Sequence, residues 1–248
     1  MLGIIGGTGL TQLANLEITH RQVIRTPYGD PSGALTFGNI KCHQVVFLAR
    51  HGYGHTIPPH LVNYRANLWA LHAQGVREVV SVATVGSIAE ALLPGAIVIP
   101  DQIIDYTHGR KTTYHDGVDK PVTHIDFTEP YARSLRELCL QAAGNAGENC
   151  TNGGVYAAVQ GPRLETAAEI NRLDRDGATV VGMTGMPEAA LARELDIAYA
   201  ALCVVANHAA GRGNSASGIH YDEIQAVVSS AMGRVHNILE HLVMLHGD

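Results

Sequence analysis

Two segments at the ends of apolar runs carry groups that bind anions. The sequence GGTG at 6–9 follows the apolar residues 2–5, and a glycine-rich turn lets backbone N–H groups approach an anion closely. Arg50 and His51 follow another apolar run at 44–49. A guanidinium offers a planar fork of donors to a phosphate or carboxylate, and an imidazole adds a hydrogen-bonding nitrogen. These residue types predict an anion site, although the glycine turn alone is equally typical of an ordinary tight turn.

Three further candidate side chains lie at positions where a predicted strand is followed by a helix or a loop. Thr184 precedes a helix that we expect to begin near Pro187, so its hydroxyl can bind an anion or cap the helix. Glu165 is expected in the first turn of another helix, where a carboxylate can also simply complement the helix dipole. Asn207 follows the most apolar run, and its amide can read the edge of a heterocycle or be structural. Together these positions predict a ligand site at strand ends.

The spacing of glycines and lysines excludes the common nucleotide cofactors. From Gly7 the sequence GTGLTQ lacks the third glycine of a dinucleotide fingerprint, and no lysine before Lys41 could complete a triphosphate-binding loop. His51, His55 and His60 lie in a loop rich in glycine and proline, without a neighbouring cysteine or carboxylate to complete a metal site. We therefore expect no metal and no cofactor, and a small free phosphate as the anion.

The composition indicates a globular protein whose partners are small molecules. Of 248 residues, 46% are hydrophobic and 16% charged, the formal net charge is −6, and the mean hydropathy is +0.05. Without a block of lysine and arginine, the chain lacks the electrostatic footprint of a nucleic-acid binder. Four scattered cysteines form no Cys-x-x-Cys pair, and no stretch of about 18 apolar residues, the length of a membrane span, occurs. We expect reduced thiols, no membrane association and a cytoplasmic location, and the sparse charge favours an oligomer.

Short apolar runs alternate with helical patterns along the chain. The runs are continuous, which is typical of strands covered on both faces. The predicted strands are residues 2–5, 44–49, 78–83, 96–100, 155–159, 178–182 and 198–206. The predicted helices are residues 63–75, 129–147, 187–196 and 222–245, and a long polar loop occupies 107–123. This order predicts one α/β domain, residues 1–248, with a parallel or mixed sheet and functional residues at strand ends.

Eight short sequences occur in the order found in one enzyme family. They are GIIGGTGL (3–10), LARHG, VNYRANLWAL, VGS (85–87), THIDFTEPY, QGPRLET, GMTGMPEAALARE and NHAAG. From about residue 3 to about residue 240 the chain resembles the methylthioadenosine phosphorylase and purine nucleoside phosphorylase family, and it is similar to the bacterial branch acting on S-methyl-5′-thioinosine. The resemblance implies a mixed central β-sheet, partly barrel-like and flanked by helices. It also implies phosphate-dependent cleavage of a nucleoside by a homotrimer without a cofactor.

The resemblance implies a phosphate site made of side chains and backbone. Its side-chain ligands are Thr8, Arg50, His51 and Thr184, and the backbone at Ala83 and Thr84 completes it. Many methylthioadenosine phosphorylases have a threonine that contacts phosphate where this chain has Ala83. Thr84 is therefore the candidate to replace that contact.

The resemblance also implies the nucleoside contacts. Met183 corresponds to the residue under the ribose, and Asn207, Glu165 and His51 are expected to act in catalysis. The implied purine contacts are Leu164, Glu165, Val181 and Asn207, and the implied 5′ contacts are Tyr221, Ile224 and His124 from a neighbouring subunit.

Glu165 and Asn207 predict which purine the site accepts. A 6-oxopurine presents an N1–H donor and an O6 acceptor, which match a carboxylate and an amide NH₂. The N1 atom of adenine is an acceptor and would face Glu165 unpaired, and such unpaired polar groups are how sites reject analogues. Adenine-type members of the family place aspartates at the positions of Asn207 and Ala209. We therefore expect hypoxanthine or guanine rather than adenine.

The residues at the predicted 5′ pocket leave several reactions open. GIHYDEI at 218–224 places Tyr221 near Ile219 and Ile224; an aromatic face suits a thioether, and a tyrosine hydroxyl suits a 5′-OH. The overall similarity favours phosphorolysis of S-methyl-5′-thioinosine to hypoxanthine and 5-methylthioribose 1-phosphate. The alternatives are phosphorolysis of inosine and guanosine, phosphorolysis of methylthioadenosine, hydrolysis by water, and an inactive purine- or phosphate-binding module.

Overall fold

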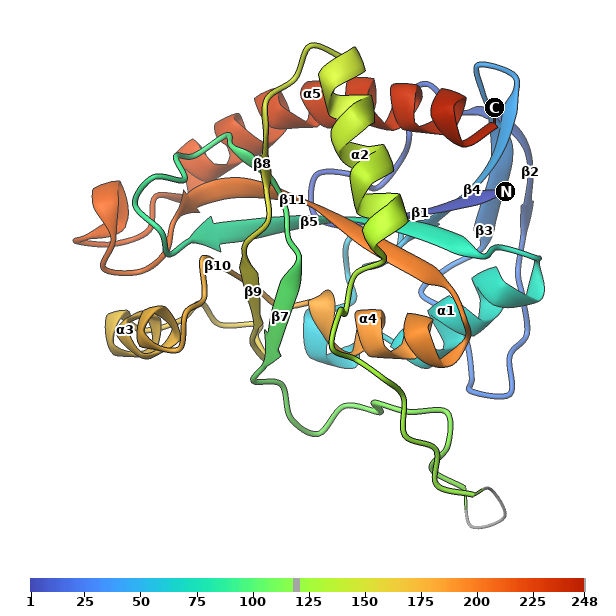
Figure 1. The fold of residues 1–248 in the computed structure, drawn as a ribbon, viewed down its shortest axis with the longest axis horizontal. Coiled ribbons are helices and arrows are strands. Elements are labelled where there is room, and N and C mark those ends of the chain that lie inside the picture. The colour runs from blue at the N-terminus through green and yellow to red at the C-terminus, as the bar shows by residue number, and fades with distance from the viewer. Residues whose placement is uncertain (118–120, 248) are drawn as a thin grey trace.

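A computed structural model describes residues 1–117 and 121–247, in which a mixed sheet carries helices on both faces (Figure 1). The strands are β1 (Leu2–Gly6), β2 (Glu17–Gln22), β3 (Leu35–Ile40), β4 (His43–Ala49), β5 (Glu78–Ser87), β6 (Ile97–Ile99), β7 (Gln102–Asp105), β8 (Cys150–Asn152), β9 (Val155–Ala158), β10 (Val180–Gly182) and β11 (Ala198–His208). The helices are α1 (Tyr64–Ala73), α2 (Arg133–Asn145), α3 (Ala167–Arg175), α4 (Gly185–Glu194) and α5 (Tyr221–Gly247), with short 3₁₀ turns at Pro59–Leu61 and Gly213–Ser215. None of these helices is both long and apolar enough to cross a membrane.

The parallel strands β4, β1, β5 and β11 form the centre of the sheet. β1 pairs with β4 and β5, and β5 pairs with β11 from Glu78 opposite Ala198 to Ser87 opposite His208. Their apolar residues are buried almost without interruption, as expected for strands with helices on both sides. Because the strands are parallel, their carboxyl ends meet at the same edge of the sheet, where ligands of α/β proteins typically bind.

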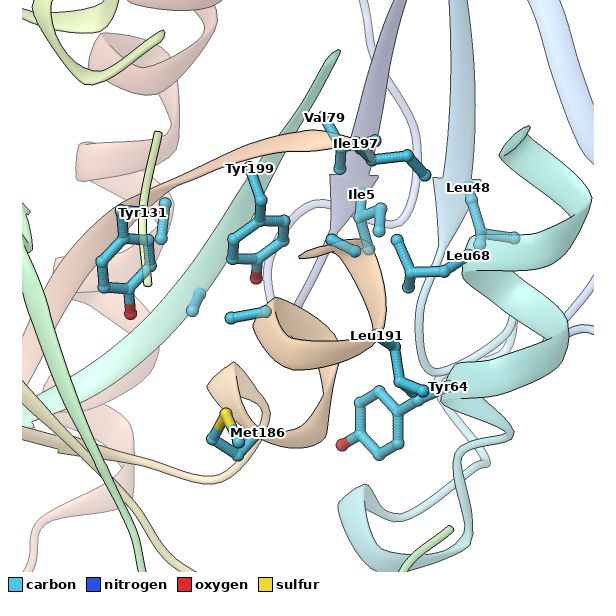
Figure 2. Packing of buried hydrophobic residues seen from close by; sticks show 14 of the residues in the cluster. Ile5, Leu48, Tyr64, Leu68, Val79, Tyr131, Met186, Leu191, Ile197 and Tyr199 are labelled. Carbon is cyan, nitrogen blue, oxygen red and sulfur yellow. The ribbon is translucent and has the colours of Figure 1, made fainter. Parts of the chain in front are cut away.

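Two layers of helices cover the sheet. In Figure 1, α1 and α4 lie on one side of β5 and β11, and α2 and α5 lie on the other. Alternate residues of one strand enter the two layers, because successive side chains of a strand point to opposite faces. Ile5 lies in the cluster with Leu68 of α1 and Leu191 of α4 (Figure 2), whereas Ile4 lies in the cluster with Leu239 of α5. The strand ends therefore belong to a sheet whose two faces are both covered by packed helices.

A gap in the sheet lies beside the middle of β5. Along one edge of β5, β1 pairs as far as Ser81, and β10 joins in the antiparallel sense at Gly86 and Ser87. Residues 82–85 have no strand neighbour on that edge among the pairings of the described residues. The carboxyl ends of β1 and β10 run towards this gap from opposite directions, which brings their following turns together.

The seven predicted strands, the four helices predicted by range and the helix expected near Glu165 are all present, with shifted ends. The sequence does not predict β2, β3, β7 and β8. β2 is exposed along its whole length, so it has no apolar run to recognise, and β7 and β8 are short and partly exposed. The predicted loop at 107–123 contains no helix or strand in its described residues, and residues 118–120 of that loop lie outside the described part of the chain.

Candidate active site

A cavity of about 480 Å³ opens at the gap beside β5. Its wall includes every candidate residue from the sequence except one: Thr8, Arg50, His51, Ala83, Thr84, Leu164, Glu165, Val181, Met183, Thr184, Asn207, Tyr221 and Ile224. These residues come from the turns after β1, β4, β9 and β10, from β5, β10 and β11, and from the start of α5. The exception is His124, which is exposed and does not contribute to the cavity of its own chain.

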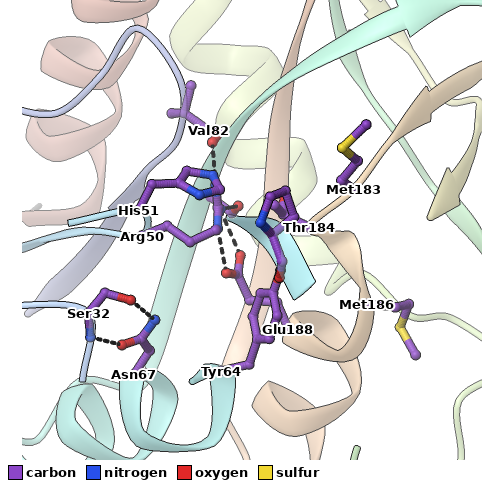
Figure 3. Close-up of polar contacts among 12 residues, drawn as sticks. Ser32, Arg50, His51, Tyr64, Asn67, Val82, Met183, Thr184, Met186 and Glu188 are labelled. Carbon is purple, nitrogen blue, oxygen red and sulfur yellow. Dashed lines mark hydrogen bonds and ion pairs between the residues drawn. The ribbon is translucent and has the colours of Figure 1, made fainter. Parts of the chain in front are cut away.

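Arg50 is anchored by a carboxylate that the sequence does not reveal (Figure 3). The guanidinium is only 1% exposed, and it donates from Nε and Nη2 to the two carboxylate oxygens of Glu188 at 2.7 and 2.9 Å. It also donates from Nη1 to the Val82 carbonyl at 3.1 Å and from Nη2 to the Ser81 hydroxyl. Burial disfavours the charged form, but the adjacent Glu188 carboxylate more than offsets this and raises the pKa of Arg50. The network fixes the orientation of the guanidinium and leaves one Nη1 hydrogen for a ligand.

Gly7 permits the close approach of Arg50 to the first turn. A Cβ at this position would lie 2.8 Å from Arg50 Nη1 and 2.6 Å from the Val82 carbonyl oxygen. These distances are shorter than van der Waals contact, so any side chain would displace the guanidinium. The glycine-rich turn is therefore needed for the packing of Arg50 in addition to any contact with a ligand.

His51 is held as a neutral imidazole. Its Nδ1 atom lies 2.8 Å from the Ile57 carbonyl, which can only accept, so Nδ1 carries the hydrogen. Burial and the nearby Arg50 charge lower the pKa of His51 to about 4, while the bond to Ile57 opposes that shift. At neutral pH the remaining ring nitrogen, Nε2, is therefore a hydrogen-bond acceptor.

The two threonines on the β1 and β5 side have different partners. The hydroxyl of Thr8 is hydrogen-bonded to His55 Nε2 at 2.9 Å, and His55 stacks on His51 with ring centroids 4.8 Å apart. The hydroxyl of Thr84 donates to the Thr8 carbonyl at 3.0 Å. This bond uses the only hydroxyl hydrogen of Thr84, so the residue braces the turn. The hydroxyl of Thr8 can donate to an anion when His55 carries its hydrogen on Nε2 and donates it to the Thr8 oxygen.

Thr184 occupies the N-terminal cap position of α4 without capping the described helix through its side chain. Its backbone N–H donates to the Tyr156 hydroxyl at 3.3 Å. The capping interpretation of this threonine is therefore wrong, and its hydroxyl lies at a helix N-terminus, a favourable place for an anion.

Glu165 lies outside the helix in which the sequence places it. The helix α3 starts after the cap residue Thr166, whose side chain accepts from the Glu169 N–H while the Glu169 carboxylate accepts from the Thr166 N–H. This reciprocal capping box moves the start of the helix beyond Glu165, so Glu169 is the acidic residue of its first turn. The prediction that Glu165 lies in the first turn of this helix is therefore wrong.

Glu165 and Asn207 present complementary groups to the cavity. Glu165 is half-buried, and this partial burial raises the pKa of its carboxyl group. The Asn207 amide follows a bulge in the pairing of β11 with β5, and one of its hydrogens goes to the His208 carbonyl at 2.6 Å. An amide has two such hydrogens and an acceptor oxygen, so the pair can accept from and donate to one heterocycle edge.

The rim of the cavity near α5 is open and apolar. Tyr221, the first residue of α5, is 69% exposed, and Leu164 is 39% exposed. Ile219 and Ile224 line the cavity beside them and are partly exposed. Large exposed apolar side chains at the rim of a cavity are typical of a surface that a ligand or another chain covers.

Sequence reasoning misses two residues that organise this site, Glu188 and Arg110. Glu188 is a single carboxylate within the otherwise apolar run MPEAALA, and that isolation is a signal for a buried ion pair. Arg110 lies in the polar loop after β7, and its contacts reach two turns of the site. Its position in the sequence has no comparable signal.

Comparisons with known proteins agree with this geometry. A family model described as "Phosphorylase superfamily" matches residues 1–244. A protein of Pseudomonas syringae pv. tomato named "Probable S-methyl-5'-thioinosine phosphorylase" is 48% identical over 240 residues, which are 97% of either chain. A protein of Thermococcus kodakarensis named "Probable 6-oxopurine nucleoside phosphorylase" is 46% identical over 215 residues, covering 85% of this chain and 80% of the relative.

A solved structure has nearly the same fold. Methylthioadenosine phosphorylase from Schistosoma mansoni in complex with adenine superimposes with a TM-score of 0.95 at 32% sequence identity. The match covers 99% of this chain and 91% of the other. The α/β fold with a mixed central sheet is thereby confirmed. With a family model and several relatives matching almost its whole length, the chain belongs to the phosphorylase superfamily.

Proposed function

We propose that residues 1–248 form one nucleoside phosphorylase domain that converts S-methyl-5′-thioinosine and orthophosphate into hypoxanthine and 5-methylthioribose 1-phosphate. One observation carries the proposal: a single cavity holds both a set of anion-binding groups and a carboxylate–amide pair that suits a 6-oxopurine. We call the first set the anion side, made up of Thr8, Arg50, His51 and Thr184. We call the second the nucleoside side, made up of Leu164, Glu165, Asn207, Tyr221 and Ile224.

The anion side suits hydrogen phosphate as the nucleophile. The hydroxyls of Thr8 and Thr184 and the remaining Arg50 hydrogen donate to its oxygens, which orients the dianion. Hydrogen phosphate carries one P–OH group, and the neutral His51 accepts that hydrogen at Nε2. An unprotonated phosphate oxygen is then free to attack C1′ of the ribose.

The nucleoside side stabilises the leaving base. As a phosphate oxygen bonds to C1′, the bond from C1′ to N9 breaks and its electrons pass to the purine through an oxocarbenium-like transition state. The purine anion becomes neutral hypoxanthine by taking up one proton through water, which balances the P–OH proton that hydrogen phosphate brings and the sugar phosphate releases. Asn207 donates to O6, where negative charge develops, and Glu165 accepts from N1–H. Met183 lies under the ribose, and Leu164 and Val181 contact the purine. The reaction uses phosphate as a co-substrate and no cofactor.

Two observations support a methylthio group rather than a hydroxyl at the 5′ position of the substrate: the apolar rim of the cavity and the names of similar proteins. Several relatives that match nearly the whole chain are named for S-methyl-5′-thioinosine, and Tyr221 and Ile224 offer apolar surface for a thioether. The second candidate is phosphorolysis of inosine and guanosine, which the relative named 6-oxopurine nucleoside phosphorylase supports. Both candidates use the same pair, Glu165 and Asn207, to read the base.

The open rim also supports a homotrimer in which His124 of one subunit completes the 5′ pocket of the next. Tyr221 and Leu164 are exposed at the rim of the cavity, and His124 is exposed away from the cavity of its own chain. Contact between subunits would cover both surfaces. We also expect the protein in the cytoplasm, since its four cysteines are unpaired.

Phosphate-dependent base release from a small substrate panel tests the function. We expect kcat/KM to be highest for S-methyl-5′-thioinosine, lower for inosine and guanosine, and lowest for methylthioadenosine. A preference for methylthioadenosine would contradict the role of Glu165 and Asn207. Base release in phosphate-free buffer would indicate a hydrolase, and no release from any nucleoside would indicate a binding module.

A further inference from the structure

Arg110 connects two turns of the site from a third segment of the chain. It lies in the long loop between β7 and α2. Its Nη1 donates to the carbonyls of Met183 and Met186 at 2.8 and 2.6 Å, and its Nη2 donates to the carbonyls of Val159 and Gln160 at 3.2 and 2.8 Å. The first two carbonyls belong to the irregular segment after β10, which includes the first two residues of α4 and is called here the turn after β10. The last two belong to the turn between β9 and α3.

The guanidinium uses all of its donors in these contacts. Nε donates to the Gln160 side-chain oxygen at 3.1 Å, and Nη1 also reaches the Tyr64 hydroxyl at 3.3 Å. Five N–H groups thus meet six acceptors, each of them uncharged. A rigid planar fork with this many partners has one orientation, so the positions of the two turns depend on each other through Arg110.

Each of the two turns carries residues from a different side of the cavity. Met183 and Met186 bracket Thr184 on the anion side, and Glu188, the anchor of Arg50, is two residues beyond Met186. Val159 and Gln160 lead into the segment that carries Glu165 on the nucleoside side. A change in the separation of the two turns would therefore change the distance between the bound phosphate and the bound base.

The backbone of both turns is irregular and depends on such a partner. Met186 has φ −119° and ψ 139°, which breaks the first turn of α4, and Gly161 has φ +61°. The turns also touch, because a Cβ added to Gly161 would lie 2.4 Å from Met183 Sδ. Carbonyls outside regular elements need a donor when they are removed from water, and Arg110 supplies it to four of them.

We propose that Arg110 is a positioning residue, which sets the distance between the phosphate-binding turn after β10 and the base-binding turn after β9. The proposal rests on the proposed function, since it concerns the geometry of the same reaction. Arg110 acts through the backbone carbonyls that it holds. Its loss is expected to impair the reaction of phosphate with nucleoside more than the folding of the chain.

Arg110→Lys tests this role. An ammonium group has three donors and no planar fork, so it cannot hold carbonyls of both turns. We expect kcat to fall on the order of 100-fold, the usual cost of misplacing reacting groups by about 1 Å. The KM values for phosphate and for nucleoside are both expected to rise, because both turns lose their support. The measurement is steady-state kinetics with each substrate varied, at a temperature well below the unfolding midpoint of each variant.

Arg136→Lys is the matched control. Arg136 also joins backbone carbonyls, those of Ile99 and Pro100 at 3.2 and 2.8 Å, together with the Asn152 side chain, and it takes no part in the cavity wall. We expect this variant to lose stability and to keep kcat within about threefold, because an arginine that only supports the fold does not position reacting groups.

Gln160→Leu keeps the test decisive if Arg110→Lys does not fold. This change removes the side-chain oxygen that accepts from Arg110 Nε and from the His108 N–H. We expect kcat to fall about tenfold, and Gln160→Glu, which keeps the acceptor, to restore it towards the wild-type value. Equal activity of the two Gln160 variants would count against the proposal.

The outcomes separate this inference from the proposed function. A wild-type protein without phosphate-dependent base release refutes the proposed function, and the inference with it. An active wild-type protein together with a folded Arg110→Lys variant of unchanged kcat refutes only the role of Arg110. A loss of kcat in Arg136→Lys equal to that in Arg110→Lys also refutes it, because the effect would then follow from general destabilisation.

Discussion

The anion side and the nucleoside side of the cavity differ in how firmly the protein itself fixes them. On the anion side Arg50 is 1% exposed, and its guanidinium is held by Glu188, Ser81 and Val82. On the nucleoside side Tyr221 is 69% exposed. The first is a closed network of charged hydrogen bonds, and the second is an open apolar surface.

This difference follows from the chemistry of the two ligands. A buried guanidinium needs a compensating charge, so Glu188 is required before any phosphate arrives. A nucleoside brings its own apolar surface, which can cover exposed side chains on binding. Changes on the anion side should therefore affect both stability and activity, whereas changes on the nucleoside side should affect activity and selectivity alone.

Glu188→Gln should break the anion side with the largest effect. The amide replaces one of the two acceptor oxygens by an NH₂ group, which faces a donor of Arg50, and it leaves the guanidinium without its charge partner. We expect the free energy of unfolding to fall by about 3–5 kcal/mol, the usual cost of breaking a buried ion pair. The KM for phosphate should rise by about tenfold, because Arg50 is no longer held in place. Chemical denaturation and phosphate-dependent kinetics measure the two effects.

Glu194→Gln provides the comparison on the same helix. Glu194 accepts from the Thr113 hydroxyl and from the Tyr114 N–H, both at 2.7 Å, and thus ties the long loop to α4. This variant should lose less stability than Glu188→Gln and keep the phosphate KM of the wild type. If Glu188→Gln unfolds at the wild-type denaturant concentration, the anion side is not built on this ion pair.

The pH dependence of stability should show the burial of His51. Its pKa is about 4 in the folded protein and about 6.5 when unfolded. Between these values the unfolded chain binds more protons, so the free energy of unfolding falls as the pH decreases from about 6.5 to about 4. The total loss is at most about 3.5 kcal/mol.

His51→Asn isolates that contribution. The asparagine amide can still donate to the Ile57 carbonyl, but it does not titrate. We expect a flatter curve of unfolding free energy against pH between 4 and 6.5 than in the wild type. An identical slope in both proteins would mean that other groups cause the acid destabilisation.

Glu165→Gln tests the nucleoside side, where activity should change without stability. The amide keeps an acceptor oxygen for N1–H of a 6-oxopurine but loses the negative charge of the carboxylate, so we expect kcat/KM for 6-oxopurine nucleosides to fall about 100-fold. The phosphate KM should stay near its wild-type value, because Glu165 belongs to a different turn from the anion side. An equal loss of phosphate affinity would contradict the role of Glu165 in reading the base.

Glu169→Gln is the neighbouring control. Its carboxylate closes the capping box with Thr166 and pairs with Arg163. The amide oxygen still accepts from the Thr166 N–H, so only the exposed ion pair with Arg163 is lost. This change should lower stability by less than about 1 kcal/mol and leave kcat/KM unaltered. The pair of variants therefore separates the carboxylate that reads the base from the carboxylate that starts α3.

The sequence predicts which residues meet in the cavity better than it predicts the contacts that hold them. Continuous apolar runs locate β1, β4, β5 and β11, and their shared direction explains why Thr8, Arg50 and Asn207 meet at one edge. The partner of Arg50 is 138 residues away. Only the packing of α4 against the sheet brings Glu188 near Arg50. The apolar run around Glu188 can therefore indicate that its carboxylate is buried, but local patterns cannot identify its partner.

Glu165 and Arg110 differ in whether the sequence contains a signal for their positions. Thr166 and Glu169 have the spacing of a capping box, and this local signal places Glu165 before α3. Arg110 has no such signal, because its acceptors are main-chain carbonyls that every sequence contains. Roles carried by side-chain patterns are thus accessible from sequence, and roles carried by backbone geometry are not.

Changes at Tyr221 should have the smallest effect and decide how the nucleoside side is completed. Because the Tyr221 side chain is 69% exposed, Tyr221→Phe and Tyr221→Leu should each change the free energy of unfolding by less than about 0.5 kcal/mol. If the ring contacts a thioether, Tyr221→Phe keeps the kcat/KM for S-methyl-5′-thioinosine and Tyr221→Leu lowers it by up to about tenfold. If the hydroxyl binds a 5′-OH, Tyr221→Phe lowers the kcat/KM for inosine instead. If neither variant changes the ratio of the two substrates, the exposed ring does not select the 5′ group, and its apolar surface is better explained by contact with a second copy of the chain.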